Sequence, residues 1–502
     1  MIRQEIVKLV QKATGEEDVR LETPEDKKYG DYSTNIAFRL KKDPKEIINK
    51  LKSNLFEKVE AAGPGFINFF ISKEYLQKQV REILKQKNNF GNLKIGQNKK
   101  VNVEFISANP TGPLHVGNAR GGFCGDVLAN VFNKAGYRVW REYYVNDRGR
   151  QIKVLQDTLE GKQGYKNEYT EKLIKKGEKD IDKAVKYIVK KIENTAKIMG
   201  IKFDKWFYET SLYPKEAKQV SGFLKKKGLV YEKDGAIWFK STEFGDDKDR
   251  VLVRAEKKTT YEEETYFLSD IAYLKNKFGR GFDWLVIFLG AEHHGYVPRL
   301  KAAAQALGYD KEKITPIVYQ LVRLIEAGKE VKMSKRTGVF VTIDELIEEV
   351  SLDVARFFFL TRSHDSHLNF DLDLAKEQSE KNPVYYVQYA HARICSILAK
   401  SEIRNPKSEN VKLLTHASEL DLIKQLIKLP EVIEDTAKDY QLQRLPQYAM
   451  ELATVFHQFY RDCHVISEDK NLTQARLALS LATQIVLKNT LSLMGISAPE
   501  KM

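Results

Sequence analysis

Cysteine is scarce in this chain, and its few cysteines are not paired in sequence. Among 502 residues there are three, Cys124, Cys395 and Cys463, and no two of them share a Cys-x-x-Cys spacing. This pattern argues against a disulfide-stapled scaffold and against a cysteine-rich zinc site. It fits a reducing compartment, and we expect a cytoplasmic protein.

Long apolar runs are also missing. No run reaches the roughly 18 apolar residues that a membrane span requires. The first residues, Met1-Ile-Arg-Gln-Glu5, lack the apolar core of a signal peptide. We therefore expect no membrane partner.

An acidic surplus is absent too, and the excess charge is positive. The chain has 83 Lys and Arg against 69 Asp and Glu, giving a net charge of +14. Such a surface suits a phosphate-rich partner, because Lys and Arg displace counterions from a nucleic-acid backbone. The alternative is a lysine-rich surface that is only solvated, and charge alone does not decide between them.

The length and residue pattern predict several domains. Residues 1–95 combine amphipathic helical segments with the strand Gly65–Ile71, which predicts a small α+β domain. The Asn-, Gly- and Lys-rich stretch 88–100 is typical of a linker.

The middle of the chain, residues 100–350, alternates strand and helix patterns. Val101–Ile106 and Arg138–Val145 are rich in β-branched and aromatic residues, and Asn118–Ala135 has helical periodicity between them. This βαβ pattern predicts an α/β fold with a parallel sheet. We expect a helical insertion around 160–250 and an almost wholly helical segment from 352 to 502.

A Pro- and Gly-rich loop joins the first of these strands to the helix. It reads Ser107-Ala-Asn-Pro-Thr-Gly-Pro-Leu-His-Val-Gly-Asn118. A helix N-terminus presents free N–H groups and partial positive charge, so it receives phosphates well. Gly117 leaves room for a nucleotide near the backbone, and His115 can donate to phosphate oxygens. The alternative is a tight turn with an incidental histidine.

A short basic segment, Lys332-Met-Ser-Lys-Arg336, follows the expected hairpin turn Glu326–Glu330. Negative charge develops on a leaving phosphate in the transition state. Cationic side chains that contact this charge stabilise the transition state and lower the reaction barrier. Lys335 is the first candidate for this role, with Lys332 assisting. The alternative is a solvated basic turn.

Gly290-Ala-Glu-His-His-Gly295 follows an apolar strand and is expected at its carboxyl end, where open α/β sheets bind ligands. Adjacent histidines also suggest a metal. Their side chains diverge, however, and no third ligand is placed nearby, so we predict no metal site.

Two acidic positions suit a planar cationic ligand. Glu104 is a charge near the end of an otherwise apolar strand, and Tyr266 and Asp270 lie four residues apart on one helix face. An ordinary surface hydrogen bond is the alternative for the Tyr–Asp pair.

Tyr386, Tyr389 and Arg393 also share one helix face. Aromatic rings and arginine are the side chains that stack on unpaired bases. The alternative is an aromatic core stripe, against which Arg393 argues.

Together the loop Ser107–Asn118 and the segment Lys332–Arg336 resemble the nucleotide-binding signatures of class I aminoacyl-tRNA synthetases. Three flanking segments narrow the likeness to the arginyl-tRNA synthetase family: Val103–Pro113, Tyr143–Ile152 and Tyr386–Arg393. The resemblance covers nearly the whole chain. It implies a Rossmann-like catalytic domain, a preceding tRNA-binding domain and a helical-bundle anticodon-binding domain. The implied reaction joins L-arginine to tRNA(Arg) at the expense of ATP.

The resemblance also assigns residues. Implied catalytic residues are His115, Gly117, Asn118, Lys332 and Lys335. Implied ATP-binding residues are Pro113, His115, Gly117, Asn118, Gly290, Glu292, His293, Met333, Ser334 and Lys335. Implied arginine-binding residues are Glu104, Ser107, Asn109, His115, Tyr266 and Asp270. Implied tRNA-binding residues are Tyr386, Tyr389, Arg393 and Met502. ATP is expected with Mg²⁺ as a substrate complex, without a tightly bound cofactor, and the enzyme is expected to be a monomer.

Two departures from the family pattern stand out. Asn118 occupies a place where the signature commonly has a second histidine, and asparagine cannot be charged. Leu352-Asp-Val-Ala-Arg356 resembles the Asp-Ala-Leu-Arg signature with two substitutions. Two alternatives stay open: a class I synthetase for another amino acid, and a catalytically silent tRNA-binding paralogue.

Overall fold

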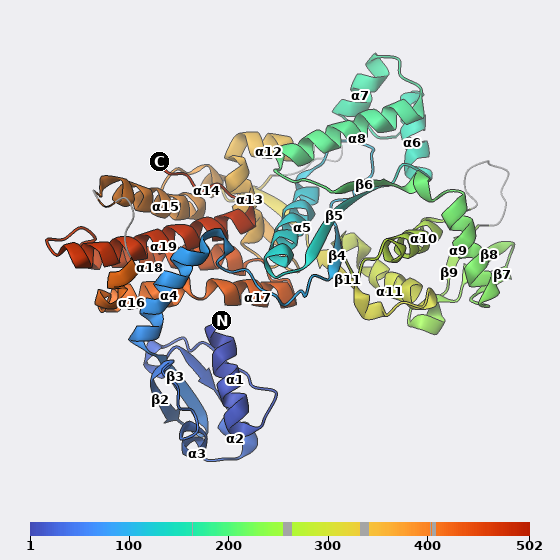
Figure 1. Cartoon of the computed structure of the whole chain (residues 1–502). Helices are drawn as coiled ribbons and strands as arrows, with labels where there is room; N and C mark the ends of the chain where they lie inside the picture. The colour runs from blue at the N-terminus through green and yellow to red at the C-terminus, as the bar shows by residue number, and fades with distance from the viewer. Residues whose placement is uncertain (163, 255–263, 332–340, 402, 404–407) are drawn as a thin grey trace.

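The computed structural model describes residues 1–502 except 163, 255–263, 332–340, 402 and 404–407. In chain order it has a small α+β region, a region built on a parallel sheet and a helical region (Figure 1). This arrangement confirms the predicted fold class.

The amino-terminal region packs helices on a three-stranded sheet. Its strands run antiparallel in the order β1-β3-β2. Ile2, Ile6 and Val10 are buried, because a four-residue spacing places them on one side of the first helix. The elements are α1 (Ile2–Thr14), η1 (Lys27–Tyr29), β1 (Tyr32–Thr34), α2 (Ile36–Leu40), α3 (Pro44–Ile48), β2 (Phe56–Ala62) and β3 (Phe66–Ile71).

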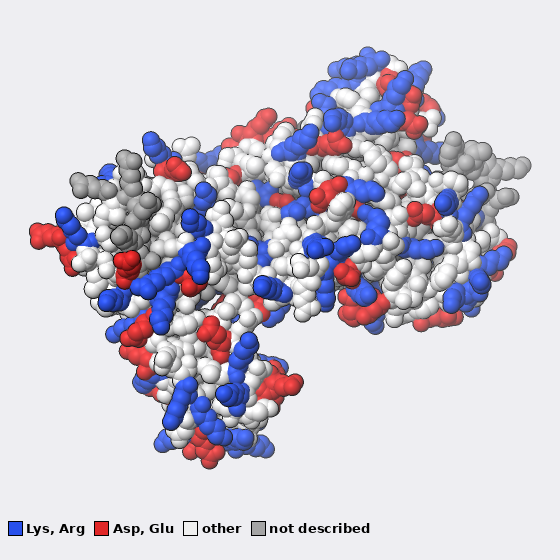
Figure 2. Space-filling view, viewed as in Figure 1, with Lys and Arg blue, Asp and Glu red and all other residues white. Residues whose placement is uncertain are grey.

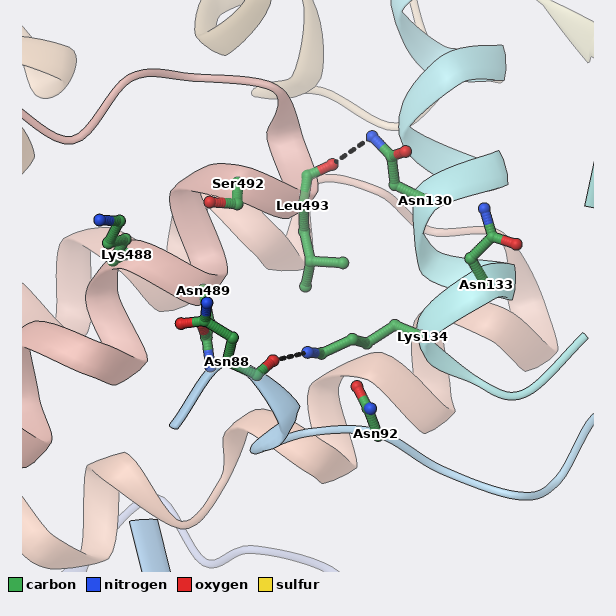
Figure 3. Close-up of a pocket in the computed structure, with 9 residues that line it drawn as sticks. All are labelled: Asn88, Asn92, Asn130, Asn133, Lys134, Lys488, Asn489, Ser492 and Leu493. Atoms are coloured by element: carbon green, nitrogen blue, oxygen red, sulfur yellow. Dashed lines mark hydrogen bonds between the residues drawn. The ribbon is translucent and has the colours of Figure 1, made fainter. Parts of the chain in front are cut away.

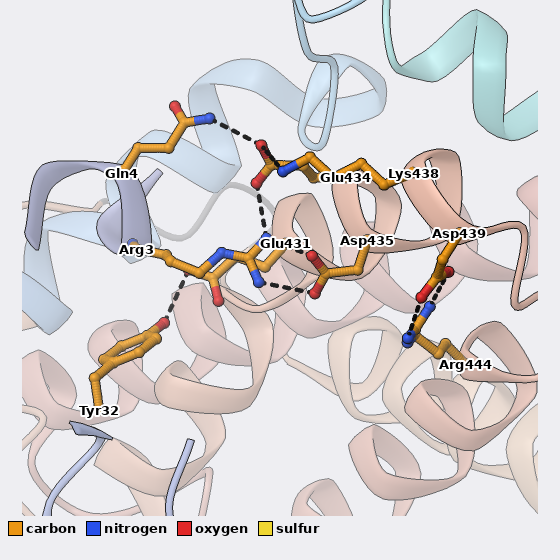
Figure 4. Close-up of polar contacts among 9 residues, drawn as sticks. All are labelled: Arg3, Gln4, Tyr32, Glu431, Glu434, Asp435, Lys438, Asp439 and Arg444. Atoms are coloured by element: carbon orange, nitrogen blue, oxygen red, sulfur yellow. Dashed lines mark hydrogen bonds and ion pairs between the residues drawn. The ribbon is translucent and has the colours of Figure 1, made fainter. Parts of the chain in front are cut away.

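Charged contacts dock this region on helix α17 (Leu429–Asp439) of the carboxyl-terminal region (Figure 4). The Arg3 guanidinium donates to Glu434 Oε2 and to Asp435 Oδ1, both at 2.7 Å. Tyr32 donates from its hydroxyl to Glu431 Oε1 at 2.9 Å. Hydrogen bonds between charged partners are stronger than neutral ones, so these contacts fix how the two regions meet.

The central sheet has the strand order β11-β10-β4-β5-β6, and every neighbouring pair is parallel. The chain extends the sheet from β4 in one direction and later returns on the other side of β4. Open sheets bind ligands at the carboxyl ends of strands beside such a reversal. The elements are β4 (Lys100–Glu104), α5 (Val116–Lys134), β5 (Arg138–Val145), β6 (Lys205–Tyr208), β10 (Trp284–Gly290) and β11 (Ile314–Tyr319).

The segment expected to be a helical insertion is more varied than predicted. Helices α6–α8 do form a projection, but β6 belongs to the central sheet and β7-β8-β9 form an antiparallel sheet. Aromatic and β-branched residues favour strands at these places within a Lys-rich stretch. The elements are α6 (Arg150–Leu159), α7 (Glu168–Lys175), α8 (Ile181–Ile198), η3 (Glu209–Leu212), α9 (Lys215–Lys226), β7 (Val230–Lys233), β8 (Ala236–Phe239), η4 (Ser241–Phe244), β9 (Arg250–Val253), α10 (Tyr266–Gly279), η5 (Ala291–Tyr296), α11 (Val297–Ala306) and η6 (Lys311–Lys313).

One strand lies inside the segment expected to be almost wholly helical. β14 (Leu368–Asp371) pairs in parallel with β12 (Val322–Glu326), so residues up to 371 continue the structure of the middle region. The surrounding elements are β13 (Lys329–Glu330), α12 (Ile343–Val350), α13 (Leu352–Leu360) and α14 (Leu372–Lys376).

The carboxyl-terminal region is a helical bundle. Its longest helix, α19, is long and apolar enough to cross a membrane by composition alone, but it is largely buried among the other helices. α4 (Lys73–Gln86), which leads out of the amino-terminal region, packs on α16 and α19. The bundle elements are η2 (Lys87–Asn89), α15 (Pro383–Lys400), η7 (Ser408–Leu413), α16 (Ala417–Leu426), α18 (Arg444–Asp462) and α19 (Lys470–Met494).

Arg356, the last residue of the Leu352–Arg356 motif, is buried where three parts of the chain meet. It pairs with Asp126 of α5 and donates to the carbonyls of Met199 at 2.8 Å and Met494 at 2.7 Å. A buried charge needs this degree of satisfaction to be tolerated. The motif therefore joins the helical bundle to the helix that follows β4.

Candidate active site

The loop after β4 is held in an uncommon backbone conformation. Ile106 and Ser107 have φ values of 66° and 40°. Residues other than glycine rarely adopt positive φ values, and two in succession are rarer still. Ser107 Oγ accepts from Tyr144 N at 3.1 Å and donates to Glu104 Oε1 at 3.2 Å. Strand end and loop are thus tied to β5.

Helix α5 packs unusually close to β4 behind this loop. A Cβ atom on Gly125 would lie 2.3 Å from Phe105 Cγ, so any side chain there would clash and only glycine fits. This close approach brings the N-terminus of α5, with its free N–H groups, to the carboxyl edge of the sheet.

His115 caps α5, and Asn118 completes the cap. His115 Nδ1 accepts from Gly117 N at 3.1 Å, and Asn118 Oδ1 accepts from His115 N at 3.1 Å. This is a capping box, in which two side chains satisfy each other's backbone donors. The asparagine in place of a second histidine therefore has a structural role at the entrance of the helix.

Desolvation in the loop lowers the pKa of His115 below its usual range, while the charge of Glu292 opposes that shift. The ring is therefore neutral at physiological pH. With Nδ1 accepting from the backbone, Nε2 carries the proton and can donate to a phosphate oxygen. Pro113 lies half-buried in the same loop.

Gly290 ends β10, next to β4, and Glu292 folds back over it. A Cβ on Gly290 would lie 2.6 Å from the Glu292 carboxylate oxygens, and His293 Nε2 lies 3.7 Å from Glu292 Oε1. Both side chains are exposed beside the carboxyl edge of the sheet. Among the described residues, no group of three His, Cys, Asp or Glu side chains is arranged to hold a metal ion.

The segment Lys332–Arg336 lies outside the described residues, and this includes Lys332, Met333, Ser334 and Lys335. The hairpin before it is present as predicted: β12 and β13 pair in antiparallel fashion around Ala327 and Gly328, both at positive φ. Buried Arg120 of α5 donates to the carbonyls of Gln320 and Ser363. These bonds attach the segment before the hairpin to α5, the helix that His115 caps.

The two predicted acidic positions, far apart in sequence, lie close in space. Burial and the negative charge of Glu209 raise the pKa of Asp270, and the negative charge of Glu104 adds to the rise. Glu104 itself forms an ion pair with buried Lys277 of α10. Tyr296 contacts Asp270 through its hydroxyl, and Tyr266, on the same face of α10 as Asp270, accepts from Gln151 N at 3.4 Å.

A third carboxylate, Glu209, was not predicted from the sequence. It follows β6 directly, is 2% exposed, and accepts from Ser269 Oγ at 2.6 Å. With its amide nitrogen turned toward the carboxylate, Asn146 donates to Glu209 Oε2 at 2.6 Å and lies against Asn109. We call Glu104, Glu209 and Asp270 the acidic pocket.

The acidic pocket has more negative than positive charge. Burial raises the pKa of Asp270 well above its usual range, and Glu209 and Glu104 raise it further. Burial raises the pKa of Glu209 to about 7. Among the described residues, Lys277 is paired with Glu104, while Glu209 and Asp270 form no ion pair. The buried Tyr144 hydroxyl lies beside Glu209. A planar cation with several donors satisfies this arrangement.

A second surface gathers rings on the bundle. Arg393 lies over the Tyr389 ring at 4.7 Å and the Tyr460 ring at 5.1 Å, and Tyr385 stacks on Tyr389. His457 packs on Tyr386 at 5.1 Å. We call this set the aromatic platform; its residues, from α15 and α18, are Tyr385, Tyr386, Tyr389, Arg393, His457 and Tyr460. The structure confirms the predicted helix face and adds partners that were not predicted.

Two exposed apolar side chains lie elsewhere. Met502 ends the chain and is 53% exposed. Phe38, at the end of α2, is 63% exposed even though its backbone is fixed, since Phe38 N donates to Gly65 O. Lys and Arg side chains are spread over the face of the molecule that Figure 2 shows, including the α6–α8 projection.

A cavity of about 430 Å³ lies away from these sites, at the other end of α5 (Figure 3). Lys134 donates to Asn88 O, and Asn130 donates to Leu493 O at 3.0 Å. These bonds join the linker, α5 and α19. The cavity therefore lies in an interdomain joint, separate from the residues predicted to bind nucleotide.

Three family models match the chain in order. They are the arginyl tRNA synthetase N-terminal domain over residues 1–71, the catalytic domain of class I (R) tRNA synthetases over 79–175 and 166–371, and the DALR anticodon binding domain over 387–502.

Full-length relatives agree with these models. An arginine–tRNA ligase of Bacillus subtilis (strain 168) is 44% identical, covering 97% of this chain and 94% of the relative. One from Oceanobacillus iheyensis is 46% identical, covering 97% and 94%. Among solved structures, Thermus thermophilus arginyl-tRNA synthetase matches with a TM-score of 0.81 at 21% identity over all of both chains. A putative arginyl-tRNA synthetase from Campylobacter jejuni matches with 0.77 at 33% identity, over 86% of this chain and all of the other.

Proposed function

The chain belongs to the arginyl-tRNA synthetase family, and we propose that it is an arginine–tRNA ligase. The carboxylate of L-arginine attacks the α-phosphorus of ATP and expels pyrophosphate. A hydroxyl of the tRNA(Arg) 3′-terminal ribose then attacks the mixed anhydride and releases AMP. The observation that carries the proposal is the acidic pocket, which lies beside the capped N-terminus of α5 and suits a guanidinium.

In this proposal, the loop Ser107–Asn118 and the segment Lys332–Arg336 bind the phosphates of ATP. His115 donates from Nε2 to phosphate oxygens, and Gly117 lets the nucleotide approach the helix N-terminus. Lys335, assisted by Lys332, meets the charge that grows on the leaving pyrophosphate. The remaining ATP-contacting residues of the proposal are Pro113, Asn118, Gly290, Glu292, His293, Met333 and Ser334.

Recognition of arginine falls to the acidic pocket. Asp270 and Glu104 accept from the guanidinium, and Tyr266 borders the same space. Ser107, Asn109 and His115 hold the α-amino and carboxylate end of the substrate in this proposal. Lysine offers a single point charge and leaves part of this fixed set of acceptors unsatisfied, so it is rejected.

Binding of tRNA falls to the aromatic platform, with Tyr386, Tyr389 and Arg393 stacking on anticodon-loop bases. Met502 adds an apolar contact with the tRNA. The net charge of +14 supports contacts with the phosphate backbone.

The remaining parts of the proposal concern state and setting. Mg²⁺ enters with ATP as part of the substrate complex, and no tightly bound cofactor takes part. The enzyme acts as a monomer in the cytoplasm.

Charging assays test the function directly. Purified protein is incubated with ATP, total tRNA and each amino acid in turn, and acid-precipitable aminoacyl-tRNA is measured. Arginine alone should be attached. Attachment of a different amino acid would identify another class I specificity, and the absence of any attachment would identify a silent tRNA-binding protein.

A further inference from the structure

The side chain of Lys277 is buried at the inner end of a polar stripe on α10. Four residues at helical spacing share this stripe: Tyr266, Asp270, Tyr273 and Lys277. Accessibility falls along it, from Tyr266 at 38% exposed to Tyr273 at 5% and Lys277 at 0%. Lysine is almost never buried so completely unless its charge is paired, so the contacts of this ammonium indicate its role.

Lys277 acts on two of the three carboxylates of the acidic pocket. Its ammonium pairs with Glu104 Oε2 and lies 4.2 Å from the centre of the Tyr273 ring. Long side chains on a helix lean toward its N-terminus, and Asp270 lies in that direction. Burial raises the pKa of Asp270, and the positive charge of Lys277 counteracts this rise.

The carboxylate of Glu104 is held at both of its oxygens. Ser107 Oγ donates to Oε1 at 3.2 Å, and Lys277 donates to Oε2. A carboxylate has about four lone-pair positions, so acceptor positions remain for a ligand, but their directions are fixed. A ligand therefore gains from Glu104 through directed hydrogen bonds, because the negative charge already has a partner.

Two other cations near the acidic pocket are engaged outside it. Arg280 donates to both carboxylate oxygens of Glu142 at 2.6 Å. Arg148, whose charge opposes the rise that burial causes in the pKa of Glu209, is partly exposed and pairs with Glu264 at 3.5 Å. Among the described residues, neither arginine pairs with a carboxylate of the acidic pocket. The positive charge that acts from within the pocket is therefore the lysine ammonium.

This internal charge changes which ligands the acidic pocket favours. Three carboxylates alone would attract every cation, and lysine carries the same charge as arginine. Lys277 cancels part of that attraction, because a unit charge about 8 Å away changes ligand affinity by more than about tenfold at an effective dielectric constant of about 20. A guanidinium offsets the loss with five directed donors, whereas an ammonium is a compact point charge.

We propose that Lys277 is a specificity-determining residue: as the internal counter-ion of Glu104, it weakens the attraction of the acidic pocket for point charges and leaves recognition to directed hydrogen bonds with a guanidinium. The inference rests on the proposed function and concerns the discrimination between arginine and lysine at the same site.

Steady-state charging of tRNA(Arg) with labelled arginine or labelled lysine tests the proposal. Lys277→Met removes the charge and the donor, whereas Lys277→Gln removes the charge and keeps an amide donor for Glu104. Both variants should raise kcat/KM for lysine relative to that for arginine by about tenfold or more. Lys277→Arg keeps the charge and should keep the wild-type ratio. The KM for ATP should stay unchanged in all three.

A second pair of variants covers the case in which loss of one buried charge prevents folding. Adding Lys277→Met to Glu104→Gln removes both partners of the ion pair, which a protein tolerates better than the loss of one. Relative to Glu104→Gln alone, the double variant should raise kcat/KM for both amino acids about tenfold, because an uncompensated ammonium is gone. Tyr273→Phe, which loses only the hydroxyl that donates to Glu142, should leave the arginine-to-lysine ratio unchanged.

Two results would overturn the inference. One is an unchanged arginine-to-lysine ratio in Lys277→Met or Lys277→Gln protein with a normal thermal midpoint, which would leave the lysine with a role in folding alone. The other is an unchanged kcat/KM for both amino acids when Lys277→Met is added to Glu104→Gln. Charging of arginine by the wild-type protein is measured in the same series, so failure of the inference is distinguishable from failure of the proposed function.

Discussion

The acidic pocket and the aromatic platform meet their ligands by opposite means. In the pocket, burial raises the pKa values of Glu209 and Asp270, and neighbouring carboxylates raise the pKa of Asp270 further. The platform is open, half-exposed and built from rings around one arginine. Buried charge gives discrimination, because an unsuited ligand leaves acceptors unsatisfied. Open stacking gives affinity that tolerates variation in the ligand. The comparison predicts that changes in the two regions affect different kinetic constants.

The largest effect is expected from Asp270→Asn. Removing one partner of a buried charged pair costs about 3–5 kcal/mol, so kcat/KM for arginine should fall by about two to three and a half orders of magnitude. The amide also presents donors to a ligand that offers only donors at that end. Steady-state charging at varied arginine and varied ATP measures this. A normal KM for arginine would place the pocket elsewhere; the KM values for ATP and tRNA should stay unchanged and serve as internal controls.

The second expected effect is a pH dependence confined to the pocket. The pKa of Glu209 is raised to about 7, so the carboxylate is ionised above that pH and protonated below it. Affinity for a guanidinium should therefore be full above pH 7 and fall as the pH drops, with the KM for arginine rising about tenfold per unit at the low end.

Glu209→Gln provides the control for this profile. A side chain that cannot ionise should give a KM for arginine that is raised above pH 7 and lacks the wild-type inflection near pH 7. A wild-type profile without that inflection would contradict the assignment of Glu209 to the pocket. The KM for tRNA should not follow the same curve.

On the platform, Tyr389→Ala should weaken tRNA binding by about 1–3 kcal/mol while leaving the KM for arginine unchanged. Tyr389→Phe keeps the ring and loses only the hydroxyl that contacts Arg393, so it should retain most of the affinity. Filter binding at fixed salt measures both. Equal losses in the two variants would mean that the hydroxyl, and not stacking, is what matters.

The sequence predicted those parts of the two sites that depend on the spacing of residues within one strand or one helix. The β4–α5 unit follows from a strand pattern, a Gly-rich loop and a helical pattern in series. The common face of Tyr386, Tyr389 and Arg393 follows from helical spacing. The joint assignment of Glu104 and Asp270 to arginine binding came from family resemblance, and in the structure the charge of Glu104 helps to raise the pKa of Asp270.

Other features had no local signal. Glu209 follows a four-residue strand inside a Lys-rich stretch, and only the aromatic run Trp206–Tyr208 hinted at a sheet edge there. His457 and Tyr460 reach the platform through packing of α18 on α15, which periodicity within one helix does not encode. The capping role of Asn118 was readable in principle, since a polar residue at the third helical position matches a capping box.

The smallest effect is expected at Phe38, which tests whether open stacking is confined to the bundle. The ring is 63% exposed on a backbone held by Gly65, and a Cβ on Gly65 would collide with Phe38 N at 2.7 Å. An apolar ring so displayed is available to stack on a base, as the platform rings are. We expect Phe38→Ala to raise the KM for tRNA about fivefold, near the low end of one stacking contact at about 1 kcal/mol. Phe38→Trp should preserve or improve binding. Because the side chain is exposed, the thermal midpoint should stay within about 1 °C of wild type. An unchanged KM for tRNA in Phe38→Ala would limit stacking to the bundle, leaving the amino-terminal region to bind through charge alone.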